Sequence, residues 1–275
     1  MSNNNHKYLA KKIREHALHM THDAKTSHIG TCLSMADLLA VIYNKVLRFD
    51  PSKPDWEERD RFILSKGHGA AIYYAILAEC GFFPKDWLNT YCQDGSKLGG
   101  HITKNEIPGI EVSTGSLGHG MPIGCGMALA GKTDNQDYRV FVMLSDGELD
   151  EGSNWEAILF AAQHRLDNLI GIVDYNKIQG FGNVNKVLNL EPLLDKFSSF
   201  GWLVKEIDGH DLDQISISLE HIPFEKGKPS IIIAHTVKGK GVSFMENKLL
   251  WHYKSPNDDE LMLALSELGE PEETV

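Results

Sequence analysis

Residues 139–145 read RVFVMLS and residues 169–174 read LIGIVD, two continuous apolar runs. Such runs are typical of central strands that are covered on both faces of a sheet. The segment Ser153–His164 between them is predicted to be a helix. Together the three segments predict a βαβ unit with two parallel strands.

Further predicted elements extend this unit on both sides. Two more strands are predicted at Trp202–Ile207 and Ser230–Ala234. Helices are predicted at Lys7–Thr21, Ser34–Leu47 (with Ser34 as N-cap), Ala70–Cys80 and Met121–Ala130. The sequence shows no internal repeat, low-complexity tract or linker, so residues 1–275 are interpreted as a single domain. Its expected class is α/β, a doubly wound and mostly parallel sheet with helices on both faces.

The composition excludes several classes of function. The chain of 275 residues has a formal net charge of −11, whereas nucleic acid and anionic membranes require a basic face. No apolar run approaches the ~20 residues of a membrane span, and the first residues lack the pattern of a secretory signal. The four cysteines show no metal-binding spacing and are interpreted as reduced thiols. We therefore expect a cytoplasmic protein with no nucleic-acid or membrane partner.

Polar residues follow each of the two central strands. Asp146 comes directly after the first strand, and Asn176 comes shortly after the second. In open parallel sheets ligands bind beyond the carboxyl ends of the strands, where neighbouring strands would bring these side chains together. A carboxylate, an amide oxygen and a nearby carbonyl suit Mg²⁺ or Ca²⁺. Gly147 would let a phosphate approach the backbone, and the helix beginning near Gly152 would offer it N–H groups.

A structural role is the alternative for each of these residues. Asp146 could cap the following helix and Asn176 could turn the chain, since both residue types are common in turns. Their joint position at the ends of successive buried strands favours the ligand interpretation.

The Asp-Gly pair and the Asn about thirty residues later resemble the thiamine diphosphate motif, usually written Gly-Asp-Gly … Asn-Asn. Ser145 replaces the first Gly and Tyr175 the first Asn, and neither change removes a metal ligand. The resemblance implies thiamine diphosphate as cofactor and Mg²⁺ (or Ca²⁺) as metal. The implied metal ligands are Asp146, Asn176 and the carbonyl of Ile178. The implied neighbours of the diphosphate on the same loops are Gly147 and Glu148.

Several histidine-containing segments resemble those of the transketolase family, which uses this cofactor. The segments are Ser27–Gly30, Leu64–Gly69, Gly99–His101, Thr114–Gly118 and Thr236–Gly241 with the later Trp251-His252. They occur in the family's order from about Ala10 to Pro256, so the resemblance covers nearly the whole chain. Ile29 stands where the family has Pro, and His119 where it has Gln.

The resemblance also implies roles for particular residues. The implied catalytic residues are His28, His101 and His252, facing the sugar, and Glu151, which would cross a subunit interface. The implied cofactor contacts are His68 and His252 at the diphosphate and Gly115, Ser116 and Leu117 along its rings. Imidazoles suit these tasks because they bind phosphates and hydroxyls and move protons near neutral pH.

The resemblance implies a partner chain as well. In the transketolase family, a glutamate of a second, pyrimidine-binding domain promotes deprotonation of the cofactor. The pyrimidine-binding and C-terminal domains find no counterpart in residues 1–275, so they are expected on a partner. The expected protein is the N-terminal subunit of a split transketolase, which transfers a two-carbon ketol unit between sugars or sugar phosphates and is active only with that partner. Symmetry favours an α₂β₂ heterotetramer.

Other interpretations remain open from the sequence. The chain could be a subunit of a 2-oxoacid dehydrogenase or a relative of 1-deoxyxylulose-phosphate synthase, although the dehydrogenase subunits lack this histidine set. It could also be a non-catalytic cofactor-binding or regulatory protein, although such a protein has no need of groups aimed at sugar hydroxyls. The donor and acceptor sugars, whether pentose phosphates or more specialised sugars, are not determined by these residues.

Overall fold

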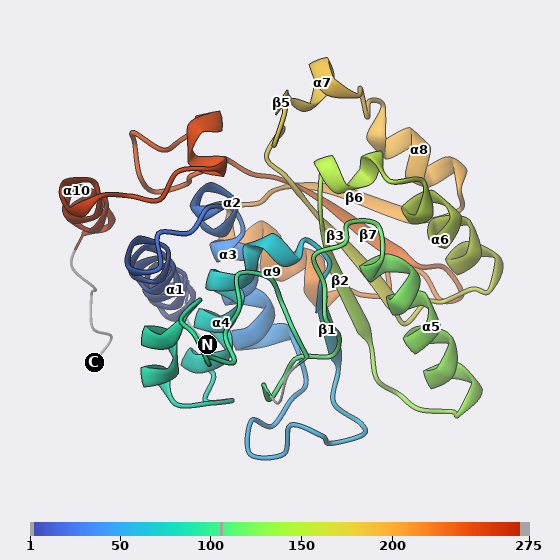
Figure 1. The fold of residues 1–275 in the computed structure, drawn as a ribbon. Helices are drawn as coiled ribbons and strands as arrows, with labels where there is room; N and C mark the ends of the chain where they lie inside the picture. Colours follow the sequence, from blue (N-terminus) through green and yellow to red (C-terminus); the bar gives the residue numbers. More distant parts are fainter. Residues whose placement is uncertain (1–2, 105–106, 270–275) are drawn as a thin grey trace.

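The computed structural model describes residues 3–104 and 107–269. Its centre is a five-stranded sheet with the strand order β1-β2-β3-β7-β6 (Figure 1). Each neighbouring pair of strands is parallel. The strands are β1 Arg61–Leu64, β2 Val140–Ser145, β3 Leu169–Tyr175, β6 Leu203–Asp208 and β7 Ser230–His235. The predicted α/β class with a mostly parallel sheet is confirmed.

The two apolar runs form the neighbouring strands β2 and β3. Val140 pairs with Leu169 and Ser145 pairs with Asp174, and α6 (Gly152–Gln163) connects the two strands. Every residue of both strands is buried. The predicted βαβ unit is therefore confirmed.

Alternate residues of each strand enter two separate hydrophobic cores, as the two-residue repeat of a strand requires. In β2, Phe141 and Met143 belong to one core, and Val140 and Val142 belong to the other. The helices that contribute to the first core include α1 Asn3–Asp23, α2 Ile29–Ser34, α3 Ala36–Val41, α4 Ala70–Glu79 and α9 Leu212–Glu220. Those that contribute to the second include α5 Gly120–Thr133, α6 and α8 Leu193–Ser199. Figure 1 shows the two groups on opposite faces of the sheet.

Short elements follow the carboxyl ends of the strands and carry the predicted site residues. They are η2 Gly67–Gly69 after β1, η4 Gly147–Asp150 after β2, and the hairpin β4 Ile178–Gln179 with β5 Gly182–Asn183 after β3. The remaining short elements are η3 Lys85–Thr90, α7 Val184–Val187 and η5 Leu249–His252. No helix among the described residues is both long and apolar enough to cross a bilayer.

The predicted helix Ser34–Leu47 is wrong in its start and its continuity. The helices α2 and α3 meet at Met35, and a π-helical turn, η1 Ile42–Val46, follows α3. Ser34 is the last residue of α2, and its hydroxyl donates a hydrogen bond to Asp174 on β3. Ser34 therefore does not cap the start of a helix as predicted, and its hydroxyl instead bonds to a residue distant in the sequence.

Strand β1 and helix α10 are among the elements that the sequence did not predict. Strand β1 contains only four residues after a charged segment, and it becomes a strand because it pairs with β2 along its whole length. Helix α10 (Asp258–Leu268) lies in the acidic segment near the end of the sequence. It begins with a capping box of Asn257 and Glu260, which stabilises the first turn locally.

Candidate active site

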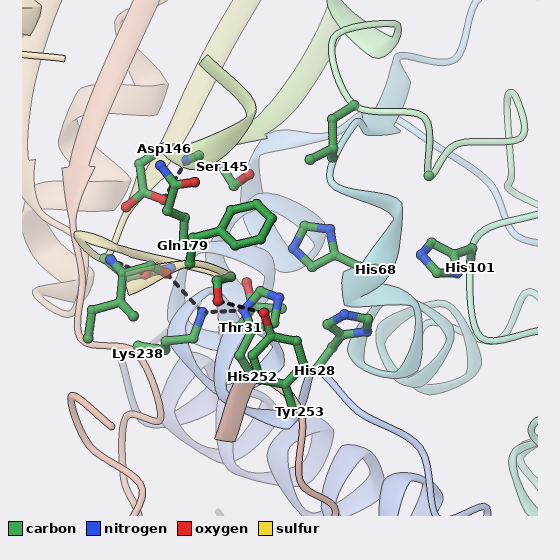
Figure 2. A pocket seen from close by; sticks show the side chains of 17 residues that line it. His28, Thr31, His68, His101, Ser145, Asp146, Gln179, Lys238, His252 and Tyr253 are labelled. Atoms are coloured by element: carbon green, nitrogen blue, oxygen red, sulfur yellow. Dashed lines mark hydrogen bonds between the residues drawn. The ribbon is translucent and has the colours of Figure 1, made fainter. Parts of the chain in front are cut away.

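A cavity of about 310 Å³ lies at the carboxyl edge of the sheet. Figure 2 shows side chains that line it. Its walls come from α2 and η5 and from the loops that follow β1, β2, β3 and β7. The predicted site residues that line it are His28, His68, His101, Gly115, Leu117, Asp146, Gly147, Asn176, Ile178 and His252. Folding therefore brings most of the predicted residues to one place.

Asp146 lies at the end of β2, and its side chain is buried. Its carboxylate accepts hydrogen bonds from the backbone N–H groups of Gly147 (2.7 Å) and Lys177 (2.5 Å). The second bond joins the loop after β2 to the loop after β3. Burial, and next the negative charge of Asp174, raise the pKa of Asp146 to about 6. A buried carboxylate of this kind is stabilised in its ionised form by a nearby cation.

Asn176 and Ile178 lie on the loop that follows β3. The side-chain oxygen of Asn176, which is 3% exposed, accepts a hydrogen bond from the N–H of Ile178 (3.1 Å). The carbonyl oxygen of Ile178 accepts a hydrogen bond from Nζ of Lys238 (3.0 Å). The side-chain oxygen of Asn176 and the carbonyl oxygen of Ile178 therefore both act as hydrogen-bond acceptors.

This donor set fits a hard divalent cation. One carboxylate, one amide and one backbone carbonyl are the oxygen ligands that Mg²⁺ and Ca²⁺ prefer. Within residues 3–104 and 107–269, no group of three or more His, Cys, Asp or Glu side chains could hold a metal ion. A cation here would therefore depend on the amide and carbonyl oxygens and on further oxygens from a ligand or water.

Four histidines from four segments converge on the cavity. The ring centroid of His28 lies 5.1 Å from that of His68, 6.0 Å from that of His101 and 5.0 Å from that of His252. The backbone N–H of His28 also donates to the carbonyl of His252 (3.0 Å). Segments near the two ends of the chain are thereby joined at the cavity.

Burial keeps three of these rings neutral. Burial, followed by the charges of His101 and Lys238, lowers the pKa of His28 to about 4. Burial, followed by Lys238 and His28, lowers the pKa of His252 to about 3. Burial also holds the pKa of His68 well below its usual range. At neutral pH each of these three rings therefore has one N–H donor and one acceptor nitrogen.

Lys238 lines the cavity, although no role is predicted for it from the sequence. Its Nζ lies 3.2 Å from Nδ1 of His252. Because an ammonium group only donates, Nδ1 accepts this bond and the ring proton lies on Nε2. Burial lowers the pKa of Lys238 to about 8, so the side chain is mostly charged at neutral pH. In the sequence it lies within the singled-out segment Thr236–Gly241, just after a predicted central strand.

The glycine-containing loop Thr114–Gly118 forms another wall. Gly115 has a φ of +134°, and a Cβ there would lie 2.9 Å from the His101 ring, so no larger residue fits. Leu117 lines the cavity, whereas Ser116 is exposed outside the lining. The hydroxyl of Ser116 instead lies 3.3 Å from Nδ1 of His119.

Two predicted site carboxylates also lie outside the cavity lining. Glu148 is fully buried and accepts hydrogen bonds from the N–H of Gly118 (3.0 Å) and the hydroxyl of Ser65 (2.5 Å). Its carboxylate holds Gly118 of the glycine loop in place, and its predicted contact with the cofactor stays a prediction. Glu151 is exposed at the start of α6, and its role at a subunit interface stays a prediction.

Comparison with known proteins agrees with this geometry. Residues 5–274 match the family model described as "Transketolase, thiamine diphosphate binding domain". The fold is thus that of a thiamine diphosphate-binding domain. The chain belongs to the transketolase family, as its metal motif and histidine segments predicted.

Relatives of this chain include separate subunits and longer enzymes. An apulose-4-phosphate transketolase subunit from Actinobacillus succinogenes is 48% identical over 241 residues, which cover 88% of this chain and 87% of that protein. The 6-deoxy-6-sulfo-D-fructose transketolase subunit SqwG of a Clostridium species is 42% identical, and the alignment covers 94% of each protein. A transketolase structure from Campylobacter jejuni aligns with a TM-score of 0.93 at 31% identity. That alignment covers 100% of this chain and 44% of the other, so this chain spans less than half of that enzyme.

Proposed function

We propose that this chain is the diphosphate- and metal-binding subunit of a two-component transketolase. The enzyme would transfer a two-carbon ketol unit from a ketose donor to an aldose acceptor. The observation that carries this proposal is the convergence of His28, His68, His101 and His252 with Asp146 on one cavity. The metal motif suits several thiamine enzymes, whereas four histidines beside it suit a substrate rich in hydroxyl groups.

The chain's part in this reaction would be to hold the diphosphate end of the cofactor. The proposed ligands of Mg²⁺ (or Ca²⁺) are Asp146, Asn176 and the carbonyl of Ile178. The proposed donors to the diphosphate are His68, His252 and Lys238, and a charge-assisted bond from an ammonium group is the strongest of these. When bound, thiamine diphosphate supplies the carbon nucleophile that the ketol transfer needs.

The histidines nearer the sugar would orient the substrate and move protons. The neutral rings of His28 and His252 can each donate to one hydroxyl and accept from another. His101 is exposed at the cavity, where an incoming sugar would meet it. Proton transfer by positioned imidazoles typically contributes about 10²–10⁴-fold to a rate.

A partner chain would complete the site by holding the pyrimidine end of the cofactor. Support for this comes from the Actinobacillus relative, which aligns over most of its length and is named as one subunit of a transketolase. The exposed position of Glu151 also leaves it available to a partner. An α₂β₂ assembly is the simplest symmetric arrangement. We place the enzyme in the cytoplasm, because its four cysteines are free thiols, as is usual in reducing compartments.

The proposed substrates are sugars with an anionic end. Two relatives are named for a phosphorylated and a sulfonated sugar. In the described part of the chain, Lys238 is the one Lys or Arg that lines the cavity, and it is 2% exposed. The anionic end of the sugar would therefore be bound mainly by the partner.

Co-purification with a candidate pyrimidine-binding chain tests the proposal. Ketol transfer should require both chains, thiamine diphosphate and Mg²⁺, and a donor and acceptor screen should include phosphorylated and sulfonated sugars. Full activity of the single chain would contradict the two-component arrangement. If no partner restored ketol transfer although the cofactor bound, a non-catalytic role in cofactor binding would replace the proposal.

A further inference from the structure

A fully buried ion pair lies next to the cavity wall. Lys66 and Asp174 are each 0% exposed, and their charged groups are in contact. Lys66 follows β1 and Asp174 belongs to β3, with β2 between them. A buried ion pair is often no more stabilising than apolar side chains of the same volume. Stability alone therefore does not explain this pair.

Asp174 is an acceptor for several donors at once. Besides Lys66, the hydroxyls of Ser34 (2.5 Å) and Thr236 and the amide nitrogen of Asn176 (3.5 Å) donate to its carboxylate. The buried ammonium group of Lys66 contacts the carboxylate of Asp174 and stabilises its ionised form. An ionised carboxylate has no proton to donate, so every group that faces it must be a donor.

This requirement fixes the orientation of the Asn176 amide. The amide nitrogen faces Asp174, so the amide oxygen faces the opposite way, where it accepts from the N–H of Ile178. A reversed amide would present its NH₂ group to the proposed metal site and would repel a cation. The carboxylate of Asp174 thus selects the orientation in which Asn176 can bind a metal.

Lys66 has the complementary effect on Thr31. The Lys66 ammonium donates to the hydroxyl oxygen of Thr31 over 2.7 Å. Because that oxygen accepts, the hydroxyl hydrogen of Thr31 is free to point elsewhere, and Thr31 lines the cavity. The oxygens of a diphosphate need such donors.

We infer that the Lys66–Asp174 pair is a positioning device that sets the hydrogen-bond polarity of the diphosphate and metal site. It directs the oxygen of Asn176 toward the metal and the hydrogen of Thr31 toward the diphosphate. The inference rests on the proposed function, because it requires that a metal and a diphosphate bind in this cavity. Neither residue of the pair lines the cavity, so both act through their neighbours.

Calorimetric titration of the full chain with thiamine diphosphate at saturating Mg²⁺ tests the inference. The Lys66→Met/Asp174→Leu double variant removes both charges at similar volume and should still fold. We expect its Kd to rise about 10–100-fold, as is typical when the partners behind metal ligands are lost. The matched control is Arg59→Met/Glu111→Leu. This control variant removes an ion pair whose side chains are 11% and 7% exposed and lie outside the cavity lining. The Kd of the control variant for thiamine diphosphate should be unchanged.

The outcomes separate this inference from the proposed function. Failure of the unmodified chain to bind would overturn the proposed function and the inference with it. Binding by the unmodified chain and equally tight binding by the folded double variant would overturn the inference alone. If the double variant does not fold, Thr236→Val, which removes one donor to Asp174 at constant shape, gives the answer. We expect about fivefold weaker binding from the loss of this hydrogen bond, and unchanged binding would overturn the inference.

Discussion

The ammonium group of Lys238 donates a hydrogen bond to the carbonyl oxygen of Ile178 over 3.0 Å. That carbonyl is also one of the three groups proposed to bind the metal. A carbonyl oxygen has two lone pairs, so it can accept this bond and coordinate a cation together. Two positive charges would then lie side by side at the cavity, which suits a ligand with several negative charges.

Lys238 should make cofactor binding depend on pH. Burial lowers its pKa to about 8, so the affinity for thiamine diphosphate at saturating Mg²⁺ should fall as the pH rises above about 8. Stability should change in the opposite direction. The folded-state pKa lies below the ordinary lysine value of 10.5, so this group's cost to stability disappears as the pH rises from about 8 to 10.5.

Calorimetric titrations and thermal unfolding over this pH range measure the two effects separately. Lys238→Met should bind the cofactor more weakly at neutral pH and should lose the fall in affinity at high pH. If the affinity of Lys238→Met still fell at high pH, a group other than Lys238 would be responsible for the pH dependence.

Asp146 should make metal binding fail at low pH. Burial and Asp174 raise its pKa to about 6, so Mg²⁺-dependent affinity should fall about tenfold per pH unit below 6, because a proton competes with the metal. The metal-free fold should not weaken through this group. Its raised pKa means that the cost of the buried charge is present above about pH 6 and is relieved by protonation as the pH falls.

Replacement of Asp146 tests the same site directly. Asp146→Ala should abolish Mg²⁺-dependent binding of thiamine diphosphate, and Asp134→Ala, at an exposed carboxylate after α5, should leave it unchanged. Calorimetry gives both affinities. Unchanged binding in Asp146→Ala would count against the proposed metal site.

His101 and His68 should affect different steps. His101 is exposed at the cavity mouth, so His101→Ala should leave cofactor affinity nearly intact and lower kcat of the two-chain enzyme about 100-fold. His68→Ala should instead weaken cofactor binding about tenfold through the loss of a donor. Titrations of the single chain and steady-state kinetics of the complex distinguish the two. Equal loss of affinity in both variants would contradict the assignment.

Glu148 and Glu151 should differ in their effect on folding. Glu148→Ala leaves the N–H of Gly118 and the hydroxyl of Ser65 without an acceptor, so we expect a loss of about 3 kcal/mol in the free energy of unfolding. Glu151 is exposed, and Glu151→Ala should change that free energy by less than about 0.5 kcal/mol. Urea unfolding measures both. If Glu151 meets the partner as proposed, its variant should weaken only the assembly, which gel filtration of the mixed chains would detect.

Much of the fold could be predicted because it depends on local pattern. The strands β2 and β3 are buried on both faces. Strands in this environment have continuous apolar sequences, which can be seen without the structure. Asp146 and Asn176 could be placed at one edge because parallel strands end on the same side of a sheet. Strand β1 and the break at Met35 could not be predicted in this way, since each depends on a pairing or contact made elsewhere in the chain.

The sequence by itself determined the class of fold, the family and most residues of the cavity, because strand periodicity and short motifs are properties of neighbouring residues. The tertiary structure alone decided which groups face one another. It placed Lys238 against Ile178 and withdrew Glu148 from the cavity. It also joined Lys66 to Asp174 across 108 positions of sequence. The physical reason is that hydrogen-bond polarity and burial depend on partners that are distant along the chain and meet only when the strand ends are assembled.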